Sequence, residues 1–412
     1  MLFKRRNERG IALMLVLTAI TILTVATVEF AYNTNVTLHL AYNERDRLQA
    51  EYLAKSALQF MLLELKYDRI YQQVVQRQNL GQMLGDTANL PLCQQFPLST
   101  GLIRAVFLGE GLEGAPLPDD VQKAVSLAQE QGAEEFLDFE GDFDAECIDE
   151  STKINLNVFA TADTTRSEGR LSPYDQQIQF FIRFLKQESY KNLFEGSDIE
   201  IEDIVRNIAD WVDPDETMYE RGSPETSLYN DKKYPLRNGK IKTIGEVHYI
   251  AGVEDQWFGP LKEQFTIYGD GKINVCAADE EIVKALLRKY IEMTPGLPPL
   301  RLDDSEVMER LLKAISEGCS SGAVGEQLPQ VISDKVQTAI TAEQGNFPDQ
   351  PPSVDPNQNQ GKGFAELLSG VKRFYTLKLH GQVNDTSVHI HTVVDIDNSD
   401  PKNWPLLYWK VY

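Results

Sequence analysis

An unbroken run of uncharged, mostly apolar residues occupies positions Ile11–Val28, directly after a short basic leader. Its eighteen residues would form a helix of roughly 27 Å at about 1.5 Å per residue, close to the thickness of a bilayer's hydrocarbon core. The basic residues precede the run, so the positive-inside rule predicts a single membrane pass with a cytoplasmic N-terminus. Everything after Glu29 would then lie on the outer face.

The helical pattern continues well beyond this membrane segment. No proline or glycine occurs from Ile11 to Leu80, which removes the common helix breakers. Apolar residues then recur at intervals of three and four, the spacing of one helix face. They are Ala54, Leu58, Met61, Leu62 and Leu65. We therefore predict a transmembrane and amphipathic helix over residues 11–70, with its apolar stripe packed on a globular head.

Strand-like patterns follow this helix and return at the end of the chain. Residues 71–160 contain two apolar runs that favour strands, LIRAVFL from Leu102 and CIDESTKINLNVF from Cys147. Residues 321–412 would form the second part of the sheet, because Tyr375, Leu377 and Leu379 alternate with polar residues as in a half-buried strand, and so do Val388, Ile390, Thr392, Val394 and Ile396, and Leu407, Trp409 and Val411. Within the latter, residues 344–363 are rich in Pro, Gln, Asn and Gly and indicate a flexible, exposed loop.

A helical pattern fills the interval between these two strand regions, residues 161–320. It begins at Ser172-Pro173, where a capping serine precedes a proline in the first turn. The simplest arrangement is an α+β fold. Its long N-terminal helix packs on an antiparallel sheet, and an all-helical domain is inserted between the strands.

The amino-acid composition limits the kinds of molecule that the protein is expected to bind. The chain has 62 Asp and Glu against 40 Lys and Arg, a formal charge of −22. Such acidity argues against nucleic acid and is compatible with divalent cations. Four cysteines permit two disulfides in an oxidising compartment, with three possible pairings. They are Cys93, Cys147, Cys276 and Cys319.

The junction between leader and apolar run resembles a prepilin-type signal. An ordinary secretory signal is cut after its apolar region, whereas here Gly10 lies directly before it. Residues 1–10 are therefore interpreted as a leader peptide removed by a prepilin peptidase between Gly10 and Ile11. The resemblance implies methylation of the new N-terminus. Most pilins and pseudopilins have Glu at the fifth mature position, where this chain has Leu15.

Four short stretches resemble the pseudopilin K family of type II secretion (general secretion pathway protein K). They are KINLNVF from Lys153, IADWVDPDE from Ile208, KINVCAADEEIVKAL from Lys272 and the C-terminal LLYWKVY. Their order is that of the family, and with the leader they are spread over nearly the whole chain. Departures are Cys276, where the family usually has Asn, and two apparent insertions at residues 109–143 and 344–363.

This resemblance implies a pilin-like fold and a minor pseudopilin at the tip of the type II secretion pseudopilus, which helps to initiate assembly and the export of folded periplasmic proteins. Its partners would be other minor pseudopilins, the prepilin peptidase, the inner membrane and secreted substrates. The large C-terminal part would be periplasmic. One alternative is a minor pilin of a type IV pilus. Another is a membrane-tethered periplasmic hydrolase that uses an acidic metal site, although no catalytic motif or paired catalytic constellation is found.

Acidic residues follow the helix that contains Trp211, in the order Asp210, Asp213, Asp215 and Glu216. Clustered hard oxygen ligands suit Ca²⁺, and Glu225, after a Gly-Ser-Pro turn, could complete the set. The family resemblance supports calcium in this inserted domain. We expect a calcium site formed by Asp213, Asp215, Glu216 and Glu225, and its alternative is a solvated acidic loop.

Two other polar patterns have structural explanations. The acidic stretch from Asp138 to Glu146 alternates like a strand and lacks EF-hand spacing, so it is interpreted as surface. His389 and His391 share one face of a predicted strand, as zinc ligands can. No third His or Cys lies near them in the sequence, and a half-exposed strand explains them equally well.

Overall fold

The computed structural model describes most of the 412-residue chain. The residues not described are 1–8, 79–80, 109–125, 128–129, 131–134, 136, 163, 165–170, 197–198, 233, 295–296, 298–299 and 346–361. The predicted insertion at 109–143 and the predicted loop at 344–363 lie largely outside the described residues.

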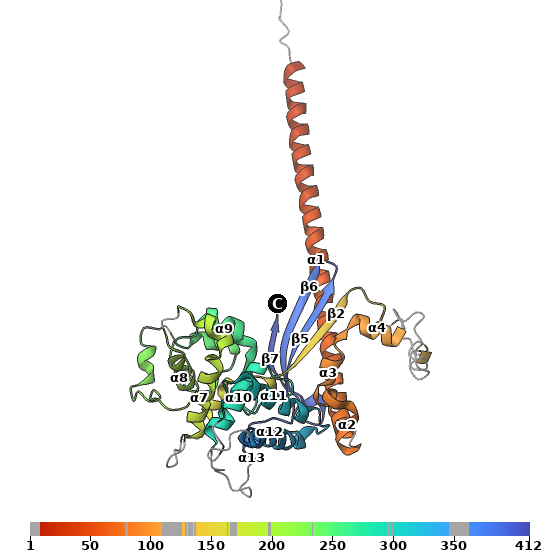
Figure 1. Cartoon of the computed structure of the whole chain (residues 1–412). Coiled ribbons are helices and arrows are strands. Elements are labelled where there is room, and N and C mark those ends of the chain that lie inside the picture. The colour runs from red at the N-terminus through yellow and green to blue at the C-terminus, as the bar shows by residue number, and fades with distance from the viewer. Residues whose placement is uncertain are drawn as a thin grey trace, which may run out of the picture.

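Helix α1 (Arg9–Gln78) runs for 70 residues and forms a stem that projects from the head (Figure 1). Its N-terminal part contains a segment long and apolar enough to cross a membrane. The part near the head packs as predicted, because Ala54, Met61 and Leu65 are fully buried. The small side chain of Ala50 lets the sheet approach closely. A Cβ added at Gly381 would lie 2.1 Å from the Ala50 carbonyl oxygen.

A five-stranded antiparallel sheet lies against this part of α1, in the order β1-β2-β5-β6-β7. Its strands are β1 (Leu98–Ser99), β2 (Asp142–Asp149), β5 (Phe374–Val383), β6 (Thr386–Asp395) and β7 (Leu406–Val411). Every second residue of β5 points to α1 and is buried, including Tyr375, Leu377 and Leu379. A two-residue turn joins β5 to β6, with Asn384 at φ +52°, a left-handed conformation that Asn tolerates.

Short helices connect α1 to β2. They are α2 (Gly81–Leu84), η1 (Gly85–Asn89), α3 (Leu92–Gln95) and α4 (Thr100–Leu108). The strand predicted at LIRAVFL is wrong, because this run forms α4. Ile103 is buried while Leu102 and Val106 are exposed, so the run uses helical spacing. Short apolar runs of this length cannot be distinguished by periodicity alone.

The helical insert comprises residues 150–373, between β2 and β5. Its α-helices are α7 (Pro173–Leu185), α8 (Ile201–Val212), α9 (Asp255–Leu261), α10 (Glu280–Met293), α11 (Ser305–Cys319), α12 (Leu328–Gly345) and α13 (Lys362–Ala365). Its 3₁₀ turns are η2 (Glu150–Thr152), η3 (Leu156–Ala160), η4 (Glu188–Phe194), η5 (Glu225–Leu228), η6 (Ile244–Tyr249), η7 (Lys262–Gln264) and η8 (Gly325–Gln327), and η9 (Pro401–Asn403) lies outside it. Strands β3 (Ile154–Asn155) and β4 (Phe265–Thr266) pair in parallel.

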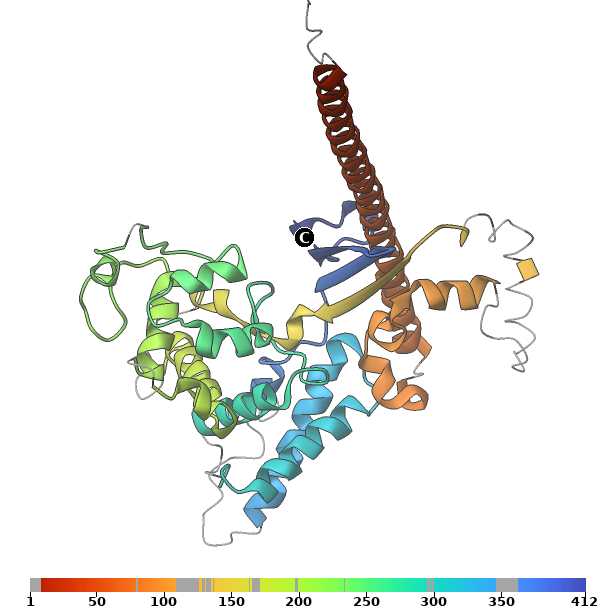
Figure 2. The ribbon, with the colours of Figure 1, turned by 90° about the horizontal axis from the view of Figure 1, so that it is seen from above.

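This arrangement confirms the predicted α+β architecture, a long helix on an antiparallel sheet with helices inserted between strands. Ser172 caps α7 and Asp175 completes the capping box, as the Ser-Pro pattern indicates. The sequence-based boundary at residue 320 falls between α11 and α12, which pack against each other. Figure 2 shows the insert on one side of α1 and α4 on the other.

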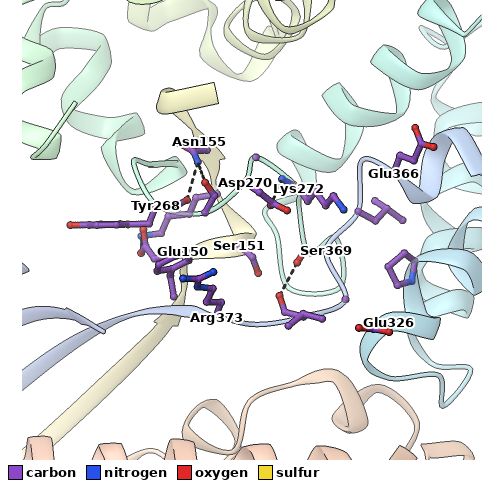
Figure 3. Close-up of a pocket in the computed structure, with 18 of the residues that line it drawn as sticks. Glu150, Ser151, Asn155, Tyr268, Asp270, Lys272, Glu326, Glu366, Ser369 and Arg373 are labelled. Atoms are coloured by element: carbon purple, nitrogen blue, oxygen red, sulfur yellow. Dashed lines mark hydrogen bonds and ion pairs between the residues drawn. The ribbon is translucent and has the colours of Figure 1, made fainter. Parts of the chain in front are cut away.

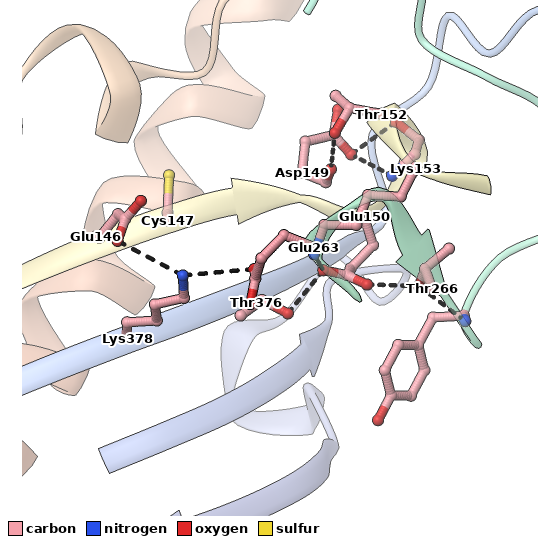
Figure 4. A network of polar contacts seen from close by, with 12 residues as sticks. Glu146, Cys147, Asp149, Glu150, Thr152, Lys153, Glu263, Thr266, Thr376 and Lys378 are labelled. Atoms are coloured by element: carbon pink, nitrogen blue, oxygen red, sulfur yellow. Dashed lines mark hydrogen bonds and ion pairs between the residues drawn. The ribbon is translucent and has the colours of Figure 1, made fainter. Parts of the chain in front are cut away.

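A buried polar network joins the insert to the sheet (Figure 4). The Glu150 carboxylate accepts hydrogen bonds from Lys153 Nζ at 2.7 Å and from Thr376 Oγ1 of β5 at 2.7 Å. Thr266 of β4 donates to the same carboxylate. Buried charges are rarely tolerated without such partners. The network therefore fixes the start of the insert against the sheet.

Two disulfides and one asparagine side chain also link separate elements of the fold. Of the three pairings that the sequence allows, the structure has Cys93–Cys147 and Cys276–Cys319. The first joins α3 to β2, and the second joins the approach to α10 with the end of α11. Asn89, after α1, donates to the carbonyl oxygen of Cys319 at 2.8 Å. The short segment that follows the stem is therefore bonded to the insert.

Candidate functional site

The predicted processing site lies at the start of the stem. Gly10 and Ile11 belong to the first turn of α1, and residues 1–8 of the leader are outside the described part. Leu15 lies one turn further along and is exposed. Its apolar side chain faces the surroundings of the stem.

The acidic residues after Trp211 form a compact group at the end of α8. Asp210 lies in its last turn, and Asp213 is the C-terminal cap residue that Pro214 follows. Because Asp210 and Asp213 are three residues apart, they share one side of the helix end. Carboxylate oxygens of Asp210, Asp213 and Glu225 all lie within 4.8 Å of one another. We call these residues the three-carboxylate cluster.

A folded-back loop brings Glu225 to the helix end. The amide of Glu225 donates to the carbonyl oxygen of Glu216 at 3.2 Å, and that of Met218 donates to Ser223 at 2.9 Å. The turn between them uses Gly222 at φ +64°, a conformation that glycine adopts without strain. Backbone hydrogen bonds therefore position a residue twelve positions after Asp213 beside it.

The cluster is almost completely buried, yet only some of its carboxylate oxygens accept a hydrogen bond. Asp210, Asp213 and Glu225 are 4%, 5% and 1% exposed. The amide of Tyr219 donates to Asp210 at 3.0 Å, and the hydroxyl of Tyr174 donates to Asp213 at 2.5 Å. One oxygen of Asp213 and both oxygens of Glu225 have no partner. Buried acceptors without partners are rare and costly, so these oxygens fit the ligands of a cation.

Burial and mutual repulsion raise the pKa values of these three carboxyl groups. Burial, followed by the neighbouring Asp213 and Asp210, raises the pKa of Glu225 to about 8. Burial likewise raises the pKa of Asp210 to about 7 and that of Asp213 to about 6. A bound divalent cation would offset both effects, because its charge stabilises the ionised carboxylates and it provides the partners that their oxygens lack.

The donor atoms in the cluster are oxygens only, which suits a hard cation. Three carboxylates can supply up to six oxygens, and Ca²⁺ takes six to eight in flexible geometry. Of the four predicted ligands, the structure brings Asp213 and Glu225 together. The side chains of Asp215 and Glu216 are exposed and lie outside the cluster. Asp210 takes part instead, and its spacing from Asp213 on the helix is the signal that could have selected it.

A larger hollow, of about 850 Å³, separates the insert from the edge of the sheet (Figure 3). Side chains of both charges line it, including Lys272, Glu326 and Arg373. Arg373 is already held by two hydrogen bonds of 2.8 and 2.7 Å to Asp395. This hollow combines opposite charges, so it does not select a cation as the three-carboxylate cluster does.

A stem with a segment long and apolar enough to cross a membrane, packed on an antiparallel sheet with helices inserted between its strands, defines an α+β protein with a long N-terminal helix and a helical insert. Residues 152–270 match the family described as type II secretion system (T2SS), protein K. This match covers the first part of the insert, including the three-carboxylate cluster. It supports the family resemblance over the stretches at Lys153 and Ile208, whereas the stretch at Lys272 and the C-terminal one lie outside the matched residues.

Comparisons with curated proteins and with solved structures add two findings. No curated protein matches the sequence of the chain. Among solved structures, the chain is similar to one in the crystal structure of the GspK-GspI-GspJ complex from the enterotoxigenic Escherichia coli type 2 secretion system. The two chains are 15% identical, and the match covers 92% of this chain and 99% of that one with a TM-score of 0.46.

Proposed function

We propose that this protein is a minor pseudopilin at the tip of the type II secretion pseudopilus, with a structural rather than an enzymatic role. The observation that carries the proposal is the match of residues 152–270 to type II secretion protein K, within an insert that sits on a pilin-like domain. The protein would help to initiate assembly and the export of folded periplasmic proteins. A type IV pilus minor pilin lacks support from this match.

The stem supports membrane insertion and contact with other subunits. Every described side chain from Ile11 to Glu44 is exposed, so none of the described residues elsewhere in the chain covers this part of α1. The proposed topology is a single pass through the inner membrane, with a cytoplasmic leader that the prepilin peptidase removes after Gly10. The new N-terminus at Ile11 would be methylated. The exposed helix would then pack against the helices of other minor pseudopilins.

Two features support a position at the tip. Leu15 cannot pair with the N-terminal ammonium of a neighbouring subunit, as a carboxylate would. An unpaired ionisable group in the bilayer costs about 2.5–3.5 kcal/mol, so an uncharged residue suits a subunit without a neighbour at that position. The helical insert also lies at the end of α1 opposite to the membrane segment (Figure 1). There it would obstruct the addition of another subunit.

Calcium at the three-carboxylate cluster is part of the proposal. Asp210, Asp213 and Glu225 would hold the ion, and the ion would fix the loop between α8 and η5. The exposed Asp215 lies beside Asp213 in an adjoining hollow of about 230 Å³. The charge of Asp215 would make the electrostatic potential beside the cluster more negative. The role of the ion is structural, because it compensates charge that the buried loop cannot otherwise tolerate.

Co-purification with the other pseudopilins of the same system tests the assignment. Full-length protein expressed with them should give a complex that contains one copy of this chain, measured by native mass spectrometry. The N-terminal peptide of the purified chain should begin at Ile11. Assembly of the chain alone into long filaments, an intact leader, or a cut beyond Val28 would each contradict the proposal.

A further inference from the structure

Three of the five histidines of the chain lie together on the sheet face that points away from α1. His380 is on β5, and His389 and His391 are on β6. The strand register places His380 directly opposite His389. The two histidines predicted on one strand, β6, are thus joined by a third, His380, from the neighbouring strand β5. It lies nine residues before His389, on the other side of the hairpin turn.

His380 and His389 form a close cross-strand pair. His389 and Tyr412 exchange both backbone hydrogen bonds, at 2.9 and 3.0 Å, so the backbone amide and carbonyl of His389 point to β7. Its pair with His380 is therefore of the non-hydrogen-bonded kind, in which side chains lie closest. The two imidazole rings are stacked, with centroids 4.5 Å apart and an interplanar angle of 16°.

A carboxylate orients one of these rings. Nδ1 of His380 lies 2.8 Å from Oδ2 of Asp144 on β2. A carboxylate can only accept here, so this contact favours the tautomer with a proton on Nδ1 and leaves a lone pair on Nε2. The same carboxylate–histidine arrangement orients the ligands of many metal sites and raises their basicity. Both histidines are partly exposed, so solutes can reach the rings.

We propose that His380 and His389 bind one divalent transition-metal ion, of the class Zn²⁺, Ni²⁺ or Cu²⁺, with Asp144 as the positioning residue. Imidazole nitrogen suits these metals, whereas Ca²⁺ prefers oxygen. Two nitrogens on a tetrahedral zinc ion at about 2.1 Å lie ~3.4 Å apart. The rings are stacked with centroids 4.5 Å apart, and His389 also stacks on Tyr412, so both rings would have to turn about their side-chain torsions to direct one nitrogen each at the ion. Water completes the coordination.

His391 is excluded from this site by its neighbours. The register places it beside Lys378 on β5 and Lys410 on β7, which would repel a cation. Lys378 lies 3.9 Å from Glu146 and 3.6 Å from Glu263, so its position is fixed between two acids (Figure 4). Burial, and then Lys378, lower the pKa of His391. This histidine therefore provides a matched control on the same strand.

Zinc titration of the full-length protein in detergent micelles tests the site by calorimetry, with Ca²⁺ in excess to occupy carboxylate sites. We expect one saturable zinc equivalent. His380→Asn and His389→Asn should each weaken binding by more than about tenfold, and Asp144→Asn by about 10–100-fold. His391→Asn should leave the affinity unchanged. Cu²⁺ should bind more tightly than Zn²⁺, following the general order for nitrogen sites.

A second measurement does not depend on the variants. The electron paramagnetic resonance spectrum of the protein with one equivalent of Cu²⁺ should show coupling to two imidazole nitrogens. The proposal is overturned if no saturable zinc binding occurs, or if the double variant of His380 and His389 binds zinc as the parent does. Since the site uses none of the residues of the calcium cluster, these results are independent of the proposed function.

Discussion

Replacing Glu225 by Gln should have opposite effects in the absence and presence of calcium. The substitution keeps the shape of the side chain and removes one charge from the three-carboxylate cluster. At 4.8 Å and an effective dielectric constant of 20, two unit charges repel by about 3.5 kcal/mol. Glu225 takes part in two such pairs, so its complete ionisation beside two ionised neighbours would cost up to about 7 kcal/mol.

Protonation reduces this cost in the metal-free protein. The pKa of Glu225 is about 8, so the group is largely protonated at neutral pH and only part of the repulsion is realised. We expect Glu225→Gln to raise the free energy of unfolding of the metal-free protein by about 1–2 kcal/mol at pH 8, and by less towards pH 5. For a region of this size the melting temperature should rise by about 2–8 °C.

With calcium bound, the parent protein should be more stable than the Glu225→Gln variant, the opposite of the order without calcium. At a hundred times its dissociation constant, Ca²⁺ should stabilise the parent by about 2.7 kcal/mol, and Glu225→Gln should lose most of that gain. Differential scanning fluorimetry with chelator and with CaCl₂ measures both effects. Glu216→Gln is the matched control, because this exposed carboxylate should change neither value. A variant that melts earlier without calcium and responds to calcium like the parent would refute the reasoning.

Three further changes should have measurable consequences. Without calcium, stability should fall as pH rises through about 6–8, because carboxyl groups with a raised folded-state pKa stabilise the fold only while they hold their protons; melting curves at several pH values check this, and calcium should abolish the slope. Removing the Cys276–Cys319 disulfide, whose cysteines are 43 residues apart, should lower the free energy of unfolding by about 4 kcal/mol, and an unchanged denaturant midpoint would contradict it. Gly381→Ala should cost about 1–3 kcal/mol, because its Cβ would meet the Ala50 carbonyl oxygen; wild-type stability would show that α1 moves away freely.

Helices and strands with long hydrophobic patterns could be predicted from the sequence. The stem has one uninterrupted helical pattern, and the alternation of Tyr375, Leu377 and Leu379 gave the face of β5 that lies on it. The run at Leu102 is too short for periodicity to separate a helix from a strand. Only its packing in the structure identifies it as a helix, because Ile103 is buried while Leu102 and Val106 are exposed.

The candidate site was predictable only where its residues follow one another closely. Asp213 was named because it lies in an acidic run after a helix, but Asp215 and Glu216 in that run point outward. Which carboxylates converge depends on the hydrogen bonds that fold the loop back, and these are not visible in the sequence. The pairing of His380 with His389 depends in the same way on strand register.

The continuity of α1 has a mechanical consequence. Its 70 residues span about 105 Å at 1.5 Å per residue, and the sequence offers no proline or glycine at which the stem could bend sharply. Near its end Gln72 donates to the Ala88 carbonyl, and Asn89 is bonded to Cys319 of the insert. An axial push applied at the membrane would therefore travel along a single rod to the far side of the head, so that stem and insert advance together as one stiff body.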